Sequence, residues 1–242
     1  MPSSERPRAE YVRSTFDRIA LRYDLLNRII SFHLDTYWRN KAVRAAVRPG
    51  ARRLLDLGTG TGDLAFAAAR AVGQGGCVVG LDFSHEMLRL AVDKKKREAS
   101  GQKTVYLQGT ALAAPFRDAS FDAVLTGFVL RNVSDLSVFF REAHRVLKAG
   151  GRLAALDMFP PASFPFSFFY SLYFHRLMPW LGGRLSRDRE AYRYLSRSVR
   201  GFHTPEAVAQ MITDAGFADV RVQKFLNGAV CLLTGDAPVK HS

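Results

Sequence analysis

The sequence predicts an α/β protein with a doubly wound, mostly parallel, seven-stranded sheet that closes with an antiparallel strand. Three observations support this class. Short apolar runs alternate with stretches of helical periodicity between residues 51 and 159, which is typical of strands and helices around a parallel sheet. The first run ends in a glycine-rich turn. The last two runs are joined by Asn227 and Gly228, a dipeptide that favours a β-hairpin.

The predicted elements begin with two or three N-terminal helices within residues 10–48, where apolar positions such as Phe16, Tyr23 and Leu26 recur at helical spacing. An α/β core follows at residues 51–159. Its strands are expected at 53–57, 77–83, 104–110, 121–128 and 151–159, and its helices at about 62–72, 84–99 and 135–148. The pattern ends within residues 204–236, with a helix at 204–215 and hairpin strands at 219–226 and 229–236.

Residues 160–200 interrupt the alternation. Their first half is rich in phenylalanine and tyrosine, and their second half is rich in arginine. We expect an inserted helical cap here, because neither half continues the strand and helix pattern. A chain of 242 residues is the size of one elaborated domain, so residues 1–242 are expected to form a single unit.

The chain is strongly basic, since 35 Lys and Arg residues outnumber 22 Asp and Glu residues and give a formal net charge of +13. This balance favours an anionic partner, either nucleic acid or an anionic membrane leaflet. Residues 93–103 concentrate part of the charge and are interpreted as a solvated helix end. The first ten residues lack the apolar stretch of a secretory signal, so we expect a cytoplasmic protein.

The glycine-rich turn LDLGTGTGDLA, residues 55–65, predicts a ligand site. In open α/β sheets the ligand lies beyond the carboxyl ends of the strands, and the first turn must let the backbone approach it closely. Gly58 and Gly60 provide bare backbone there. Asp82 ends the next strand, where a carboxylate can accept both hydroxyls of a ribose. The expected ligand is therefore nucleoside-like.

Asp63 narrows the choice of ligand. A dinucleotide fingerprint would place glycine at this position, and a carboxylate at a helix N-terminus repels a pyrophosphate. No Gly-Lys-Ser/Thr follows the turn, which argues against a Walker phosphate site. S-adenosylmethionine carries a sulfonium and an ammonium but no phosphate, so Asp56 and Asp63 suit its methionine end. S-adenosylmethionine is the predicted cofactor.

Several stretches together resemble a known family. They are FDRIALRYDLLNRIISF with Trp38 and Arg39, LDLGTGTGDLA, GLDFSHEML, LRNVSD, RVLKAGGRL, YRYLSRSV and DAGFADV. Their order is similar to that of class I S-adenosylmethionine-dependent methyltransferases, and in particular to the ubiquinone/menaquinone biosynthesis C-methyltransferases, over residues 13–236. YDLLN, LRNV and YRYL carry the resemblance to the narrower family, because the other motifs are shared by many methyltransferases.

The resemblance implies a set of cofactor-binding residues. Thr61, with Gly58, Gly60 and Asp82, is expected around the methionine and ribose parts, Thr110 and Ala111 around the adenine, and Gly127 at the pocket entrance; Asp56 and Phe83 complete the set. Thr110 departs from the family, which usually has Asp or Asn there to meet the adenine amino group. A hydroxyl has a shorter reach, so weaker cofactor binding is expected.

The implied reaction is transfer of a methyl group to a carbon of a quinol ring. A ring carbon becomes nucleophilic when a ring hydroxyl loses its proton, so the site needs a base and a group that holds the phenolate. The predicted catalytic set is Arg131, Asn132, Tyr192, His33 and Asp35, and His175 and His203 are further candidates for the base. Asp35 is a second departure, because it occupies a position where the family usually has histidine.

The aromatic part of residues 160–200 fits a polyprenylated quinol substrate, since its side chains can exclude water around an isoprene tail. With the basic charge it indicates peripheral contact with the inner face of an anionic membrane. The sequence predicts no metal site and no nucleic-acid partner, and it leaves the oligomeric state open. Two alternatives remain: a methyltransferase acting on another small molecule or on RNA, and a non-catalytic homologue.

Overall fold

The computed structural model describes residues 31–160 and 197–239, together with Ser14, Asp17, Ala20, Asp24, Asn27 and Arg28. All six of these N-terminal residues are helical, as expected for the segment 10–48. Most of the predicted cap at 160–200 lies outside the described residues, and Tyr192 and His175 lie there too.

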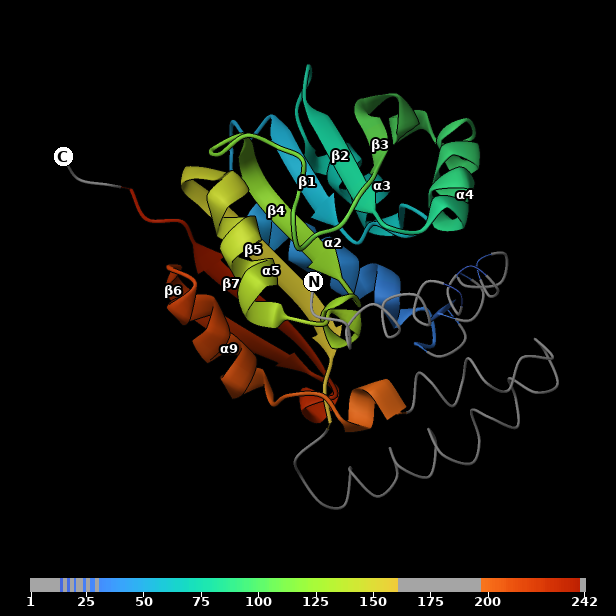
Figure 1. The fold of residues 1–242 in the computed structure, drawn as a ribbon. Coiled ribbons are helices and arrows are strands. Elements are labelled where there is room, and N and C mark those ends of the chain that lie inside the picture. The colour runs from blue at the N-terminus through green and yellow to red at the C-terminus, as the bar shows by residue number, and fades with distance from the viewer. Residues whose placement is uncertain are drawn as a thin grey trace, which may run out of the picture.

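Seven strands form one sheet, with the spatial order β3-β2-β1-β4-β5-β7-β6 (Figure 1). Their bounds are β1 Arg53–Leu57, β2 Cys77–Asp82, β3 Thr104–Gln108, β4 Phe121–Gly127, β5 Leu147–Met158, β6 Ala218–Phe225 and β7 Val230–Asp236. β1 lies between β2 and β4, where the strand order reverses, and ligands of doubly wound sheets bind at such a reversal. The predicted fold class is confirmed.

The sheet is parallel from β3 to β5, and β7 is antiparallel to both of its neighbours. The hairpin between β6 and β7 forms where the sequence predicts it. Asn227 and Gly228 have φ values of 54° and 89°, a region that favours asparagine and glycine. They lie in the short 3-10 helix η4 (Leu226–Gly228) that joins the two strands.

Helices cover both faces of the sheet. α5 (Leu136–Val146) and α9 (Pro205–Asp214) pack on one face, and α2 (Leu34–Ala46) and α3 (Asp63–Ala71) pack on the other (Figure 1). α4 (His85–Lys95) follows β2 and contacts β3. Adjacent residues of the central strands point to opposite faces, so Leu55 joins the core under α5 and Leu54 the core under α2.

Three predicted boundaries differ from the structure. The fifth strand begins at Leu147, four residues before the predicted start, because Leu147 already pairs with Phe121 and the register then shifts to Ala123 and Arg152. The helix before this strand therefore ends at Val146. The helix predicted at 84–99 ends at Lys95, and a 3-10 helix, η1 (Ala99–Lys103), leads into β3.

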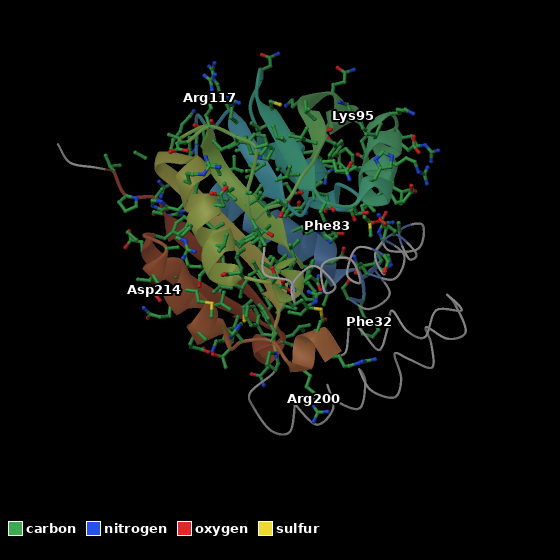
Figure 2. All side chains as sticks on the ribbon, viewed as in Figure 1. Phe32, Phe83, Lys95, Arg117, Arg200 and Asp214 are labelled. Carbon is green, nitrogen blue, oxygen red and sulfur yellow. The ribbon has the colours of Figure 1, made fainter. Side chains whose placement is uncertain are left out.

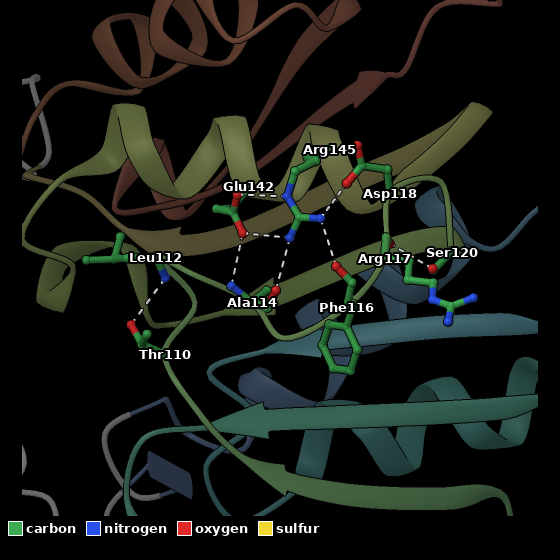
Figure 3. A network of polar contacts seen from close by, with 9 residues as sticks. All are labelled: Thr110, Leu112, Ala114, Phe116, Arg117, Asp118, Ser120, Glu142 and Arg145. Carbon is green, nitrogen blue, oxygen red and sulfur yellow. Dashed lines mark hydrogen bonds and ion pairs between the residues drawn. The ribbon is translucent and has the colours of Figure 1, made fainter.

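The connection from β3 to β4, residues 109–120, contains no regular element, yet it is held firmly by α5. The Arg145 guanidinium donates to the carbonyls of Ala114 and Phe116 and pairs with Asp118. Glu142 accepts from Arg145 and from the Ala114 N–H. Figure 3 shows these contacts converging on the guanidinium, and the bond to Arg145 lowers the pKa of Glu142. The network fixes the path of the chain that leaves the edge strand.

Candidate functional site

The glycine-rich turn joins β1 to α3 at the carboxyl edge of the sheet. Gly58 and Gly60 have φ values of 74° and 54°, and the Gly58 N–H donates to the Leu81 carbonyl at 2.8 Å. A Cβ on Gly58 would lie 2.5 Å from Cγ2 of Val129, whereas one on Gly60 would meet open space. The turn therefore packs against the loop after β4 at Gly58 and leaves open space beside the half-buried backbone of Gly60.

Asp82 connects the first two loops of the site. It ends β2, is 6% exposed, and accepts the Gly60 N–H at 2.7 Å on Oδ2 and the Ser84 N–H at 2.9 Å on Oδ1. Each carboxylate oxygen can accept a second hydrogen bond. Burial raises the pKa of Asp82 against these N–H bonds, which lower it. Phe83, the next residue, is partly exposed and lies at the same edge in Figure 2.

Asp56 is fully buried in β1 beneath the turn. Its Oδ2 accepts the Thr59 hydroxyl at 2.7 Å, and its Oδ1 has no hydrogen-bond partner among the described residues. Burial raises the pKa of Asp56 to about 7, although the Thr59 bond and the charge of Arg39 lower it. A buried carboxylate oxygen without a donor is costly, so this atom favours a cationic or N–H donating ligand nearby.

Thr61 contacts the N-terminal segment. It is 2% exposed, and its hydroxyl donates to Asp24 at 2.5 Å and accepts from Lys94 at 3.0 Å. Lys94 also forms an ion pair at 2.7 Å with Asp63, the first residue of α3. Burial raises the pKa of Asp63, but Lys94 and Arg39 outweigh it and the pKa is lowered. Asp63 is therefore ionised at the end of the turn, and Lys94 compensates its charge.

Thr110 and Ala111 lie in the loop after β3. The Thr110 hydroxyl accepts the Leu112 N–H at 3.2 Å (Figure 3), and Ala111 packs against the core under α5. Because the hydroxyl already accepts this bond, its own O–H remains the group with which Thr110 can address a ligand. An O–H donor matches a ring nitrogen of adenine rather than its amino group.

Gly127 ends β4, and the residues after it carry the predicted catalytic pair. Arg131 and Asn132 lie in the 3-10 helix η2 (Leu130–Asn132). Arg131 is 8% exposed and forms a short ion pair with Asp157, which is completely buried near the end of β5. Burial raises the pKa of Asp157, whereas Arg131 lowers it. The pair ties the loop after β4 to the adjacent strand.

The two predicted residues around the start of α2 have different surroundings. The His33 side chain is exposed, and its backbone has the left-handed conformation, with φ 62°. Asp35 is 3% exposed; it accepts the Ser31 hydroxyl at 2.9 Å and lies 3.6 Å from Arg39. Arg39 itself reaches β4, since a Cβ on Gly127 would lie 3.4 Å from its Nη1. Asp35 thus orients a buried arginine that faces the site, and His33 lies outside this pairing.

Four residues of the site were absent from the predicted set. Asp24 and Asp17 contact Thr61 and Ser84, Lys94 joins Asp24 to Asp63, and Asp157 holds Arg131. Asp24 belongs to the YDLLN stretch, which carries the resemblance to the narrower family. Asp157 had a signal of its own, because it is an acidic residue near the end of a buried apolar strand, where ligand-binding groups gather in such sheets.

The described residues fit the cofactor that the sequence predicts. The bare backbone at Gly60, the spare lone pairs of Asp82 and the unpartnered oxygen of Asp56 lie in one loop cluster. This cluster is rich in carboxylates, which suits a ligand with a sulfonium and an ammonium better than one with phosphates. Among the residues whose placement is described, no three metal-ligating side chains come together.

Comparison with known proteins identifies the family of the chain. The ubiE/COQ5 methyltransferase family model matches residues 4–236. A demethylmenaquinone methyltransferase of Thermus thermophilus is 44% identical over 223 residues, covering 92% of this chain and 100% of the relative. The ubiquinone/menaquinone biosynthesis C-methyltransferase UbiE of Desulfotalea psychrophila is 41% identical, covering 90% and 87%.

A solved structure is similar at the level of the fold. An S-adenosylmethionine-dependent methyltransferase from Aquifex aeolicus superposes with a TM-score of 0.61 at 19% identity, covering 85% of this chain and 92% of that one. This likeness agrees with the fold of a class I methyltransferase. The family is assigned by the match over nearly the whole chain and by the relatives above 40% identity: the chain belongs to the ubiE/COQ5 methyltransferase family.

Proposed function

We propose that this enzyme transfers the methyl group of S-adenosylmethionine to a ring carbon of a polyprenylated quinol, of the demethylmenaquinol type. The observation that carries the proposal is the contact of Val129 with Gly58. It brings the loop that bears Arg131 directly against the glycine-rich turn. The names of the relatives, demethylmenaquinone methyltransferase and UbiE, support the same substrate class.

The residues around the turn divide the work of binding the cofactor. Asp82 is assigned the ribose hydroxyls, and Asp56 and Thr61 the methionine end. Thr110 and Ala111 border the adenine, and Phe83 and Gly127 border the ring and the entrance. When bound, S-adenosylmethionine supplies an electrophilic methyl group on a sulfonium. The acidic surroundings favour this cation over the neutral sulfur of the product, because the charge at sulfur disappears on transfer.

Arg131 is assigned the quinol oxygen. A guanidinium held in place by a buried carboxylate can stabilise the phenolate that makes the neighbouring ring carbon nucleophilic, or orient the water that removes the hydroxyl proton. Asp157 keeps Arg131 in one orientation, so little reorganisation accompanies the charge that develops on the ring oxygen. After methyl transfer the ring carbon gives its proton to water, and the aromatic phenolate that results takes up a proton to give the methylated quinol. Asn132 is assigned to pinning this loop.

We also propose that the enzyme takes the prenyl tail of its substrate from a membrane surface. Phe32 is 72% exposed and Tyr37 50% exposed, and Tyr37 packs edge to face on Phe225. Phe32 is labelled in Figure 2. These aromatic groups and the net charge of +13 support collection of a lipid substrate from an anionic surface. In the part of the chain that the structure describes, no helix is long and apolar enough to cross a membrane.

The test is methyl transfer from labelled S-adenosylmethionine to a panel of demethylated quinols with short prenyl tails, with total RNA as a comparison substrate. Label in the methylated naphthoquinol supports the proposal. Label in RNA alone would identify an RNA methyltransferase, and cofactor binding with no transfer to any acceptor would identify a non-catalytic homologue. Both results would contradict the proposal.

Arg131→Ala and Asn132→Ala sharpen the test. Removal of a preorganised guanidinium is expected to lower single-turnover methylation by about 100- to 1,000-fold, with cofactor affinity nearly unchanged. Asn132→Ala is expected to lower both the rate and the melting temperature. Parent-like turnover of Arg131→Ala would make Arg131 a structural clamp and would move the search to Tyr192, His33 and Asp35.

A further inference from the structure

Lys94 joins three parts of the chain, although its basic run was interpreted from the sequence as a solvated helix end. Its Nζ lies 2.5 Å from Oδ2 of Asp24 and 2.7 Å from Oδ1 of Asp63, and it donates to the Thr61 hydroxyl at 3.0 Å. Asp24 belongs to the N-terminal helical segment, Asp63 begins α3, and Lys94 is on α4. One ammonium therefore connects the N-terminus to the glycine-rich turn.

A second contact of the N-terminal segment lies about two helical turns away. Asp17 and Asp24 are both helical and seven residues apart, a spacing that puts them on one face of a helix. Asp24 accepts from Thr61 in the loop after β1, and Asp17 accepts from Ser84 in the loop after β2. Both contacts lie beside residues that are assigned to the cofactor. Gly60 is the immediate neighbour of Thr61, and Asp82 lies two residues before Ser84. Asp24 and Asp17 thus contact the two cofactor loops, one loop each.

Electrostatics make Lys94 the decisive member of this contact. Asp24 and Asp63 both lie within hydrogen-bond distance of its ammonium, so their charges are close together and repel each other without it. The side chains of Lys94, Asp24 and Asp63 are only 23–28% exposed, which leaves limited water to screen the repulsion. Loss of the ammonium is therefore expected to drive the N-terminal segment away from the turn.

We propose that Lys94 is a positioning residue that fastens the N-terminal segment across the cofactor loops and so retains bound S-adenosylmethionine. This inference rests on the cofactor assignment of the proposed function. A ligand held by Gly60 and Asp82 leaves only after the contacts of Asp24 with Lys94 and Thr61 open. Lys94 therefore controls the rate at which the cofactor dissociates and does not take part in the methyl transfer itself.

The experiment compares Lys94→Met, Asp24→Asn and the double variant with the parent. Lys96→Met is the matched control, because Lys96 lies in the same basic run, is 70% exposed and forms an ion pair with Asp93, away from the glycine-rich turn. Lys94→Arg, which keeps the charge and several donors, tests for rescue. Two quantities are measured: the dissociation rate of S-adenosylhomocysteine after rapid dilution, and amide hydrogen exchange of the peptide spanning residues 14–28 in the ligand-free protein.

Each single change is expected to raise the dissociation rate about 5- to 20-fold, as for loss of a charge-assisted hydrogen bond. The double variant should be no faster than the faster single variant, because both changes break one contact. Exchange in residues 14–28 should rise in parallel, and Lys94→Arg should restore part of both.

Three results would overturn the inference. They are dissociation rates equal to those of Lys96→Met, effects of the two single changes that multiply in the double variant, and faster exchange without faster dissociation. A variant that fails to fold is recognised by loss of exchange protection throughout the sheet, and Asp24→Asn then decides between these outcomes. If the parent binds neither S-adenosylmethionine nor S-adenosylhomocysteine, the cofactor assignment of the proposed function fails, and the inference fails with it.

Discussion

Asp56→Asn is expected to change the pH dependence of stability in a defined direction. Burial raises the pKa of Asp56 from the ordinary 3.8 to about 7 in the folded protein. The folded state therefore holds this proton more tightly than the unfolded chain does, so the contribution of Asp56 to stability is fully present below about pH 4 and is lost as the pH rises through about 7. Because Asp56 is 0% exposed, solvent screening does not reduce the effect.

The size of the effect follows from the pKa values. Each pKa unit is about 1.4 kcal/mol, so full ionisation of Asp56 costs about 4 kcal/mol, of which about 2–3 kcal/mol falls between pH 5 and pH 8. Asparagine carries no charge, and its carbonyl can still accept the Thr59 hydroxyl that Asp56 accepts at 2.7 Å. The free energy of unfolding of the parent should therefore fall by about 2–3 kcal/mol more than that of Asp56→Asn between these pH values.

Urea denaturation followed by the fluorescence of Trp38, which is 5% exposed, measures both free energies. Asp122→Asn is the control, because Lys148 and two backbone N–H groups lower the pKa of Asp122 against the effect of burial. Its contribution is lost only as the pH falls below about 4, so its profile should parallel that of the parent between pH 5 and pH 8. Parallel profiles for Asp56→Asn as well would refute a neutralised Asp56.

Asp82→Ala should weaken binding of S-adenosylhomocysteine by about 2–4 kcal/mol, because two charge-assisted hydrogen bonds to the ribose are lost; calorimetric titration measures it, and parent-like affinity would remove Asp82 from the site. Gly58→Ala should lower the free energy of unfolding by about 1–3 kcal/mol, since its φ is 74° and the new Cβ would lie 2.5 Å from Val129. Gly50→Ala, at φ 86° with nothing within 4 Å, separates the backbone cost from the clash, and equal losses would show that Val129 adjusts freely. The protein should sediment with anionic vesicles at low salt and dissociate as salt rises, whereas protein that stays in the supernatant at every ionic strength would refute the membrane contact.

The strands could be predicted well because a buried parallel strand is a short apolar run between turn residues. β1 is predicted at its observed bounds, and β2 and β4 differ by one residue at one end. β5 begins early for a tertiary reason, since Leu147 gains its partner Phe121 from a strand far back in the chain. Helical periodicity before the strand gives no sign of that pairing.

The site could be predicted only where its residues are neighbours in sequence. The turn with Gly58 and Gly60 is a local motif, and its spacing to Asp82 follows from one strand and helix unit. Lys94 shows what is missing from such reasoning. A lysine in a basic run is usually solvated, and only the packing of α4 beside the turn places it on Asp24 and Asp63. Such partners, separated by many residues, require the folded chain.

The sign of the charge differs between the whole chain and the buried part of this enzyme. The whole chain carries a net charge of +13, yet the buried charged residues in the described part are the four aspartates Asp35, Asp56, Asp82 and Asp157 and the two arginines Arg39 and Arg131. A buried charge is retained only when it is paired or used. Asp35 and Asp157 hold the arginines, which leaves Asp82 for a ligand, together with Asp56, whose proton a bound cation would displace. An anionic partner is thus attracted to the surface, whereas the interior favours a cation, and the proposed reaction needs both at once: a lipid quinol from an anionic membrane and a sulfonium cofactor within the sheet edge.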